Sequence, residues 1–243
     1  MAGRRVLITG GTGSIGRGLI EAFTNSKDLV TFTYMSNKEQ SETLKASYGA
    51  EAIQVDFMDD IRLPTRDFEI VVNNIGINIS RSKVSEVTLK EWSDTLRLNL
   101  TVPFLIAQMC IPSMINGGWG RIINISSIYG LRAVEGNLAY TVSKHGLAGV
   151  TKTIAKEYGE YGITCNEICP GPVESKMMQR IGKIEAAAEK LTEEEYFESI
   201  RSDIPVGRLA VPQDVAACAV FLASPEASYI NGVSIPLDGG LIA

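Results

Sequence analysis

A glycine-rich segment near the N-terminus constrains the fold of this chain more than any other feature. The segment TGGTGSIG at 9–16 follows a short β-branched run, 4–9, and precedes an apolar-periodic stretch expected to be helical. A strand, a glycine turn and a helix in this order typically bind a dinucleotide, because backbone N–H groups and the helix N-terminus can approach its pyrophosphate. The residues expected to line such a site here are Gly10, Thr12, Gly13, Ser14, Ile15 and Gly16.

Strand and helix patterns alternate along the rest of the chain. Further strands are expected at 29–34, 52–55, 70–73, 121–125 and 163–168, and helices at 38–48, 88–115 and 138–159. This alternation predicts an α/β fold with a doubly wound parallel sheet of the Rossmann type. Only thirteen residues separate Asp56 from the strand at 70, so the helix expected there is reduced to one or two turns.

Composition limits the class of protein. The 243 residues contain no linker-like or single-sign stretch, which predicts a single domain at 1–243. A net charge of −5 disfavours a surface for nucleic acid or an anionic membrane, since either would need a basic stripe. The apolar run at 6–8 is too short for a signal or a membrane span, so we expect a soluble cytoplasmic protein.

Cysteine and histidine usage argues against metal chemistry. The four cysteines, Cys110, Cys165, Cys169 and Cys218, form no CxxC pair, and His145 is the single histidine. These counts predict reduced thiols, no metal site and no histidine-dependent triad. His145 is expected to be a packing or interface residue.

The end of the second strand bears on the choice of coenzyme. An acidic residue there would bond the ribose hydroxyls of NAD and repel the extra phosphate of NADP. The chain instead has Tyr34, Ser36, Asn37 and Lys38, with no acid before Glu39, which favours NADP(H), with NAD(H) as the alternative. Gly13 is a small argument against NADP(H), since many NADP-binding proteins carry a basic residue in that loop.

A tyrosine and a lysine, Tyr140 and Lys144, lie four residues apart in LAYTVSKHGL at 138–147. In a helix this spacing places both side chains on one face, where the ammonium can lower the pKa of the phenol by electrostatic attraction. The same spacing occurs by chance on many amphipathic surfaces, so the pair alone does not establish an active site.

The ordered motifs of the chain resemble the short-chain dehydrogenase/reductase family, specifically its single-domain branch. From Val6 to Gly240 they are TGGTGSIG at 9–16, Asp56, NNIG at 73–76, Asn99 in LNL, IINISS at 122–127, YTVSK at 140–144, PGPVES at 170–175 and the terminal VSIPLDGG. Several motifs in order are far more specific than any one of them. Within the family the chain is similar to 3-oxoacyl-acyl-carrier-protein reductases.

The resemblance implies a catalytic set and a mechanism of hydride transfer. Tyr140 would be the general acid in ketone reduction, Lys144 would lower its pKa and hold the nicotinamide ribose, and Ser127 would bond the substrate oxygen. Asn99 would hold a water that relays protons to Lys144. Ser126 is the rival of Ser127, its alternative role being a hydrogen bond at the strand end.

The resemblance also implies further coenzyme contacts. Asp56 would bond the adenine amine, Asn74 and Gly76 would line the adenine ribose, and Val173 with Ser175 would meet the nicotinamide amide. Pro170 and Gly171 would turn the chain over that ring. Two departures, Ser14 and Ile75, stand where the family often has glycine and alanine, and bear on affinity rather than on the presence of the site.

The segment 174–204 is where single-domain members carry a substrate lid. Its apolar residues would close over an apolar ligand or simply pack as a helix pair on the body; they are Met177, Met178, Ile181, Ile184, Tyr196 and Phe197. The segments 114–120 and 157–162, which tend to be basic in reductases of carrier-linked substrates, lack lysine and arginine. A small-molecule ketone or secondary alcohol is therefore the preferred substrate, with a 3-oxoacyl carrier protein as the alternative.

The length of the chain and its filled catalytic positions argue against two other classes of protein. Epimerases and dehydratases of the extended branch need a sizeable C-terminal domain, whereas 103 residues follow Tyr140 here. A non-catalytic NADP-binding protein would keep the glycines and lose the chemistry, whereas all four catalytic positions are filled. The resemblance further implies a homotetramer or homodimer built on the helices at 88–115 and 138–159.

Overall fold

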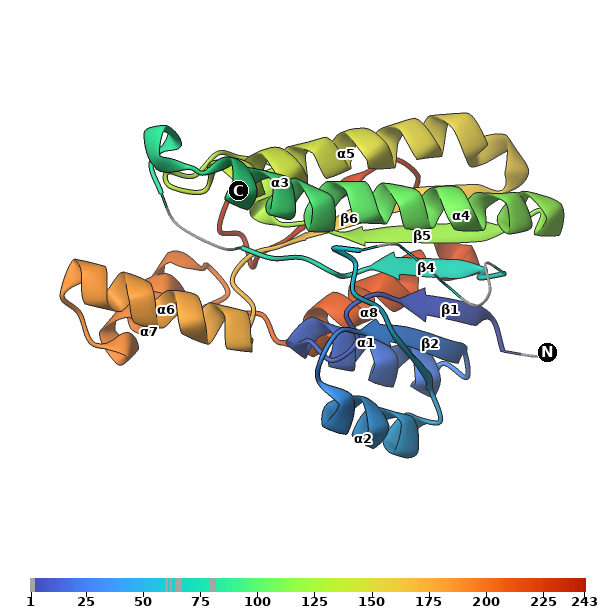
Figure 1. The fold of residues 1–243 in the computed structure, drawn as a ribbon, viewed down its shortest axis with the longest axis horizontal. Coiled ribbons are helices and arrows are strands. Elements are labelled where there is room, and N and C mark those ends of the chain that lie inside the picture. The colour runs from blue at the N-terminus through green and yellow to red at the C-terminus, as the bar shows by residue number, and fades with distance from the viewer. Residues whose placement is uncertain (1–2, 60, 62, 64–66, 79–81) are drawn as a thin grey trace.

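The computed structural model describes residues 3–59, 61, 63, 67–78 and 82–243. Within these residues seven strands form one parallel sheet in the order β3-β2-β1-β4-β5-β6-β7 (Figure 1). The strands are β1 (Arg5–Ile8), β2 (Leu29–Tyr34), β3 (Glu51–Gln54), β4 (Ile70–Asn73), β5 (Gly120–Ile125), β6 (Ile163–Pro170) and β7 (Ser234–Leu237). The predicted doubly wound Rossmann-type fold, with a single domain, is confirmed.

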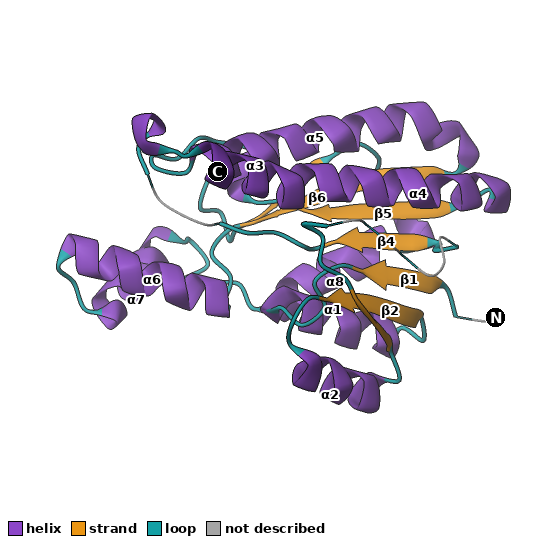
Figure 2. Cartoon of the chain, viewed as in Figure 1, coloured by secondary structure: helices purple, strands orange, loops and turns teal. Residues whose placement is uncertain are grey.

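Helices cover both faces of this sheet (Figure 2). One face carries α1 (Ser14–Asn25), α2 (Lys38–Tyr48) and α8 (Pro212–Leu222), and the other carries α3 (Leu89–Leu96), α4 (Val102–Gly117) and α5 (Leu138–Tyr158). The helices α6 (Lys176–Glu189) and α7 (Glu193–Asp203) project beyond the carboxyl ends of the strands. Short 3₁₀ turns lie at Val84–Glu86, Ile128–Gly130, Gly159–Tyr161 and Pro225–Ala227.

The core consists of two apolar layers separated by the sheet. Successive residues of β1 enter opposite layers: Val6 and Ile8 pack with α1 and α8, whereas Leu7 packs with α4 and α5. All three are fully buried. Continuous apolar strands are expected when helices cover both faces of a parallel sheet, and this burial holds the loops at the carboxyl ends of the strands in place.

The long helix expected at 88–115 is confirmed as a continuous helical run, Leu89–Gly117, but it is not a regular α-helix throughout. A π-helical segment, Arg97–Thr101, separates α3 from α4. Pro103 in the first turn of α4 supplies a reason, because in a regular helix its ring would clash with the carbonyl of Asn99 four residues earlier. The wider turn relieves that contact, and single-turn π segments occur often at functional sites.

In the crossover between β3 and β4, residues 57–59 form a turn, while residues 60, 62 and 64–66 lie outside the described part of the chain, so the expected reduced helix is only partly tested.

The combined helix Leu89–Gly117 is long and apolar enough to span a membrane. Its buried residues, among them Ile106 and Met114, pack in the core layer beneath it, as expected of a core helix.

Candidate active site

The carboxyl ends of the strands hold a cleft with two connected parts, of about 400 Å³ and about 340 Å³. Ile15, Ser175 and Met177 line both parts. The first part, which we call the nucleotide groove, lies over the glycine loop after β1. The second part, the substrate cavity, lies against Tyr140. A crevice at the carboxyl ends is where open α/β sheets bind their ligands.

The glycine loop has the close backbone packing that a phosphate-binding turn requires. Gly10 has a φ of +67°, and the N–H of Gly13 donates to the Gly10 carbonyl at 3.1 Å. A Cβ on Gly16 would lie 2.3 Å from that same carbonyl oxygen, which no side chain permits. The turn delivers the chain into the N-terminus of α1, where unpaired N–H groups favour an anion.

The loop after β4 connects the groove to the catalytic residues. The N–H of Asn74 donates to Thr9 Oγ1 at 2.9 Å, and the Asn74 side-chain amide donates to the Thr9 carbonyl at 3.0 Å. Two residues on, a Cβ on Gly76 would lie 3.5 Å from Asn99 Oδ1 and 3.6 Å from Lys144 Nζ. Gly76, which lines the groove, therefore lies directly against Asn99 and Lys144.

Most of the predicted coenzyme residues lie in the cleft. Those lining the nucleotide groove are Gly10, Thr12, Gly13, Ser14, Ile15, Tyr34, Asp56, Asn74, Gly76 and Ser175. Those lining the substrate cavity are Tyr140, Pro170, Gly171 and Val173, with Ile15 and Ser175 again. Gly16 and Lys144 are buried directly behind the lining.

Three residues predicted to select the coenzyme lie outside the groove lining: Ser36, Asn37 and Lys38. Asn37 is the N-cap of α2, where its side chain accepts the N–H of Gln40 at 3.1 Å. The groove is lined instead by Arg17, an exposed residue that sequence reasoning missed. A signal was available, because Arg17 follows the last loop glycine and lies in the first turn of α1, beside the end of β2.

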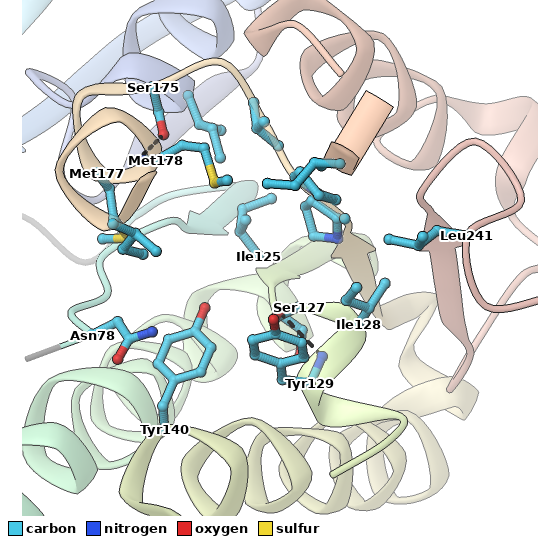
Figure 3. A pocket seen from close by; sticks show the side chains of 18 of the residues that line it. Asn78, Ile125, Ser127, Ile128, Tyr129, Tyr140, Ser175, Met177, Met178 and Leu241 are labelled. Atoms are coloured by element: carbon cyan, nitrogen blue, oxygen red, sulfur yellow. Dashed lines mark hydrogen bonds between the residues drawn. The ribbon is translucent and has the colours of Figure 1, made fainter. Parts of the chain in front are cut away.

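Two of the four predicted catalytic side chains, Ser127 and Tyr140, line the substrate cavity (Figure 3), and the other two, Lys144 and Asn99, are buried outside its lining. Tyr140 projects from α5, and Ser127 follows β5 at the same level. The ammonium of Lys144, 3 % exposed, donates to the Ile125 carbonyl at 2.9 Å and lies 5.6 Å from the centre of the Tyr140 ring. The helical spacing and the strand end together bring these three groups to one place.

The electrostatics of the pair differ from the expectation. Burial raises the pKa of Tyr140 to about 12, and a hydrogen bond with Ser127 lowers it only in part. Burial is the largest effect on this phenol in the coenzyme-free chain, and the lowering of its pKa by Lys144 stays a prediction. Burial lowers the pKa of Lys144 to about 8, with Glu167 acting in the opposite direction. At neutral pH the phenol therefore carries its proton and can donate it.

Asn99 lies in the π segment and is fully buried. Its Oδ1 accepts the N–H of Ile77 at 2.8 Å, and its Nδ2 donates to the Ile77 carbonyl at 2.9 Å and to Ser143 Oγ at 3.1 Å. This side chain therefore ties the loop after β4 to α5. Its place beside Lys144 is the one expected from the sequence, and its direct contacts hold the loop.

Ser127 and Ser126 differ in surroundings. Ser127 forms the hydrogen bond with Tyr140 and accepts the N–H of Tyr129 at 3.2 Å. Ser126 also borders the cavity, but its hydroxyl lies beside Glu167 and Cys169 and lowers the pKa values of both. The geometry therefore favours Ser127 as the partner of the substrate oxygen.

The remaining sequence predictions concern metals and thiols. No group of three or more potential metal ligands occurs in the part of the chain that the structure describes. The four cysteines, which all lie in the described residues, form no disulfide, and three of them are buried. His145 is exposed, and its Nδ1 lies 3.0 Å from the Thr141 carbonyl on its own helix, away from the cleft.

The helices α6 and α7 form one wall of the cleft. Ser175 caps α6 by accepting the N–H of Met178 at 3.0 Å, and the N–H of Lys176 donates to Ser14 Oγ at 3.3 Å. The wall therefore begins in contact with the glycine loop. Of the apolar residues expected here, four line the substrate cavity: Met177, Met178, Ile181 and Tyr196. Ile184 is exposed, and Phe197 packs against Tyr196.

Comparisons with known proteins agree with this geometry. A family profile described as Enoyl-(Acyl carrier protein) reductase matches residues 10–242. The chain is 32% identical to the 3-oxoacyl-[acyl-carrier-protein] reductase of Aquifex aeolicus, covering 99% of this chain and 98% of that protein. It is 34% identical to the acetoacetyl-CoA reductase of Rhizobium meliloti, covering 98% of each.

A solved structure shows the same architecture. A variant of actinorhodin polyketide ketoreductase with NADPH superposes with a TM-score of 0.90 at 27% identity, covering 98% of this chain and 97% of that chain. The similarity extends over the glycine loop, the catalytic positions and the α6–α7 wall, since it includes nearly the whole length of both proteins.

Proposed function

We propose that this chain, which belongs to the short-chain dehydrogenase/reductase family, reduces a small ketone with NADPH. It would also catalyse the reverse reaction, the oxidation of the alcohol. The observation that carries the proposal is the position of Tyr140. Its protonated phenol is hydrogen-bonded to Ser127 at the wall of the substrate cavity, next to the nucleotide groove. The family itself is one of oxidoreductases, and the four catalytic positions are filled.

The groove fits a dinucleotide. The tight turn at Gly10, Gly13 and Gly16, whose backbone packing a Cβ at Gly16 would disrupt, suits a pyrophosphate. We assign Asp56 to the adenine, Asn74 and Gly76 to its ribose, Lys144 to the nicotinamide ribose, and Val173 with Ser175 to the nicotinamide amide. When bound, NADPH supplies the hydride that the reduction requires.

The protein groups handle the proton and the developing charge. The carbonyl oxygen of the substrate would accept hydrogen bonds from Ser127 and Tyr140, and as negative charge grows on it Tyr140 would donate its proton. The tyrosinate left behind would be stabilised by Lys144, whose pKa of about 8 keeps it mostly charged at neutral pH. Asn99 would hold the loop that joins the two parts of the cleft.

The structure supports Arg17 as a ligand of the 2′-phosphate. Its guanidinium is exposed and lines the groove together with Tyr34, and a guanidinium suits phosphate recognition. Replacing Arg17 with alanine is expected to weaken NADPH binding about tenfold, as loss of one charge-assisted hydrogen bond would. NADH binding should change little, since NADH lacks that phosphate.

Fluorescence titration of both coenzymes measures this difference, and Lys38→Ala is the matched control. Lys38 carries the same charge but lies outside the groove lining, so its replacement should leave NADPH binding nearly unchanged. Equal weakening of NADPH and NADH by Arg17→Ala would show that Arg17 supports the loop rather than reading the phosphate.

The substrate cavity supports a ketone with a short apolar arm. Its volume is about 340 Å³, and most of its lining is apolar, including Ile128, Met178 and Leu241. A 3-oxoacyl carrier protein is the second candidate, favoured by the similarity to the Aquifex aeolicus reductase. The lack of lysine and arginine at 114–120 and 157–162 favours the free small molecule, because an acidic carrier would gain little electrostatic steering.

A direct comparison of substrates tests this proposal. Purified protein with NADPH would be assayed against small ketones, free 3-oxoacyl thioesters and the same acyl groups on carrier protein. We expect kcat/KM for the free compounds to equal or exceed that for the carrier-linked form. A carrier-linked substrate reduced more than about tenfold faster would establish the second candidate, and no turnover with any ketone would refute reductase activity.

Three wider properties complete the proposal. The wall formed by residues 174–204 is assigned as a substrate lid, because it borders both parts of the cleft. A homotetramer or homodimer is assigned through the groove between α4 and α5, where Phe104 is 42 % exposed beside Pro112 and Val150. Thiols that form no disulfide in the described residues suit a reducing compartment, so we place the protein in the cytoplasm.

A further inference from the structure

A buried carboxyl group lies beneath the catalytic residues and has no part in the mechanism described so far. Glu167 occupies the middle of β6 and is fully buried. In the sheet it is paired with Asn124 of β5 on one side and Ser234 of β7 on the other. The face of the sheet that carries Glu167 also carries Cys165, which packs in the core layer with α4 and α5.

The surroundings of this carboxyl are only partly complementary. Oε1 accepts a hydrogen bond from the Cys169 thiol, a weak donor, at 3.6 Å, and the hydroxyls of Ser234 and Ser126 also face the carboxyl. Burial raises the pKa of Glu167, and the hydroxyls of Ser234 and Ser126 and the ammonium of Lys144 lower it. A carboxyl that is fully buried and surrounded mainly by weak donors is costly to retain in the middle of a sheet.

The groups that face Glu167 come from four elements. Lys144 approaches from α5, the thiols of Cys165 and Cys169 lie on β6 itself, and the hydroxyls of Ser126 and Ser234 belong to the ends of β5 and to β7. Among these groups in the described part of the chain, Lys144 is the cation. Its interaction with Glu167 is reciprocal, because the carboxylate opposes the effect of burial on the ammonium.

We propose that Glu167 is a positioning residue of the active site, a buried counter-charge that keeps the Lys144 ammonium protonated and thereby available to Tyr140. This inference rests on the proposed function for the roles of Tyr140 and Lys144. It assigns to Glu167 no contact with substrate or coenzyme. The geometry brings the two groups to neighbouring strands: the ammonium donates to the Ile125 carbonyl at 2.9 Å, and Ile125 directly follows Asn124, the β5 residue that pairs with Glu167.

The test replaces Glu167 with glutamine, which keeps the shape and removes the charge. Reduction requires charged Lys144, so activity falls as pH rises through the pKa of that group, about 8 in the native protein. We call this fall of kcat at high pH the alkaline limb. Without the Glu167 carboxylate the alkaline limb should move to lower pH by about one unit. Glu167→Asp keeps the charge and should restore the limb toward its native position.

A second measurement needs no turnover. The folded-state pKa of Lys144 lies below its ordinary value of 10.5, so thermal stability gains from this group as pH rises from about 8. In Glu167→Gln this gain in stability should begin about one pH unit lower, because loss of the carboxylate lowers the folded-state pKa of Lys144 further. Unfolding of the coenzyme-free protein across pH 6–10 therefore reports the same shift if the proposed substrate class is wrong.

The control variant is Cys165→Ala, which alters the same face of β6 without removing a carboxylate. It should lower the melting temperature and leave the alkaline limb in place. If Glu167→Gln does not fold, Ser234→Ala removes a hydroxyl that favours the carboxylate, and should move the limb in the same direction by a smaller amount. A limb at its native pH in these variants, with only a loss of stability, would overturn the proposal.

Discussion

Replacing Tyr140 with phenylalanine should lower kcat for ketone reduction by about a hundredfold to ten-thousandfold, the range that a positioned general acid contributes. Ser127 cannot take the place of the phenol, since it can donate a hydrogen bond but cannot release a proton at neutral pH. NADPH binding should change by no more than a few fold, because the ring and the helix remain. Steady-state kinetics and fluorescence titration measure the two quantities.

Tyr129→Phe is the matched control for this experiment. Tyr129 lines the same cavity, and its ring meets that of Tyr140 edge-on with 6.3 Å between centres. Loss of its hydroxyl should change kcat less than tenfold, because it lies outside the acid, lysine and serine set. Equal losses in both variants, or unchanged turnover in Tyr140→Phe, would refute the assignment of the acid.

Replacing Lys144 with methionine should separate activity from stability. We expect kcat to fall at least about a hundredfold, because the tyrosinate formed during reduction loses its neighbouring cation. At pH 7 the free energy of unfolding should stay level or rise. The pKa of Lys144 lies near 8 rather than 10.5, which corresponds to roughly 3 kcal/mol of burial cost. Loss of the hydrogen bond to the Ile125 carbonyl offsets about 1–3 kcal/mol of that gain.

The pH dependence of this effect has a defined sign. Between about pH 8 and 10.5 the folded native protein releases the Lys144 proton while the unfolded chain keeps it, so native stability rises with pH in that window. The methionine variant lacks this rise, and its advantage should shrink from pH 8 upward. Denaturant unfolding at several pH values measures both curves.

Lys152→Met provides the comparison on the same helix. Lys152 is exposed, so its replacement should alter neither kcat nor the pH dependence of stability. If Lys144→Met instead lost several kcal/mol at pH 7, the ammonium would be a structural cation whose contacts outweigh its burial. Retained activity in Lys144→Met would contradict its catalytic role.

The local pattern of the sequence was sufficient for the fold and for the place of the active site. The alternation of strands and helices, with a glycine loop after the first strand, left few other topologies, because parallel strands require crossovers and their carboxyl ends meet at one edge. Tyr140 and Lys144 were placed together by the helical period alone. These are local steric and periodic effects, which the order of the residues specifies directly.

Only the tertiary structure shows which of several neighbouring residues meets Tyr140 and which lines the nucleotide groove. Ser126 and Ser127 both border the cavity, and only the tertiary packing shows that Ser127 meets Tyr140 whereas Ser126 lies beside Glu167. Arg17 rather than Lys38 lines the groove because α1 turns it toward the end of β2, whereas α2 carries Lys38 away. Sequence spacing records neither orientation.

The chemical state of the site was decided by burial. Proximity of a lysine suggested an acidified Tyr140, yet the packed strands and α5 exclude water, and desolvation dominates and raises the pKa of that phenol. The position of Glu167 beneath Lys144 likewise depends on the register of β6 between β5 and β7. The sequence by itself determined which groups are present and near one another along the chain. Only the tertiary structure determined their solvation and their partners, because both depend on segments distant in sequence that surround them together.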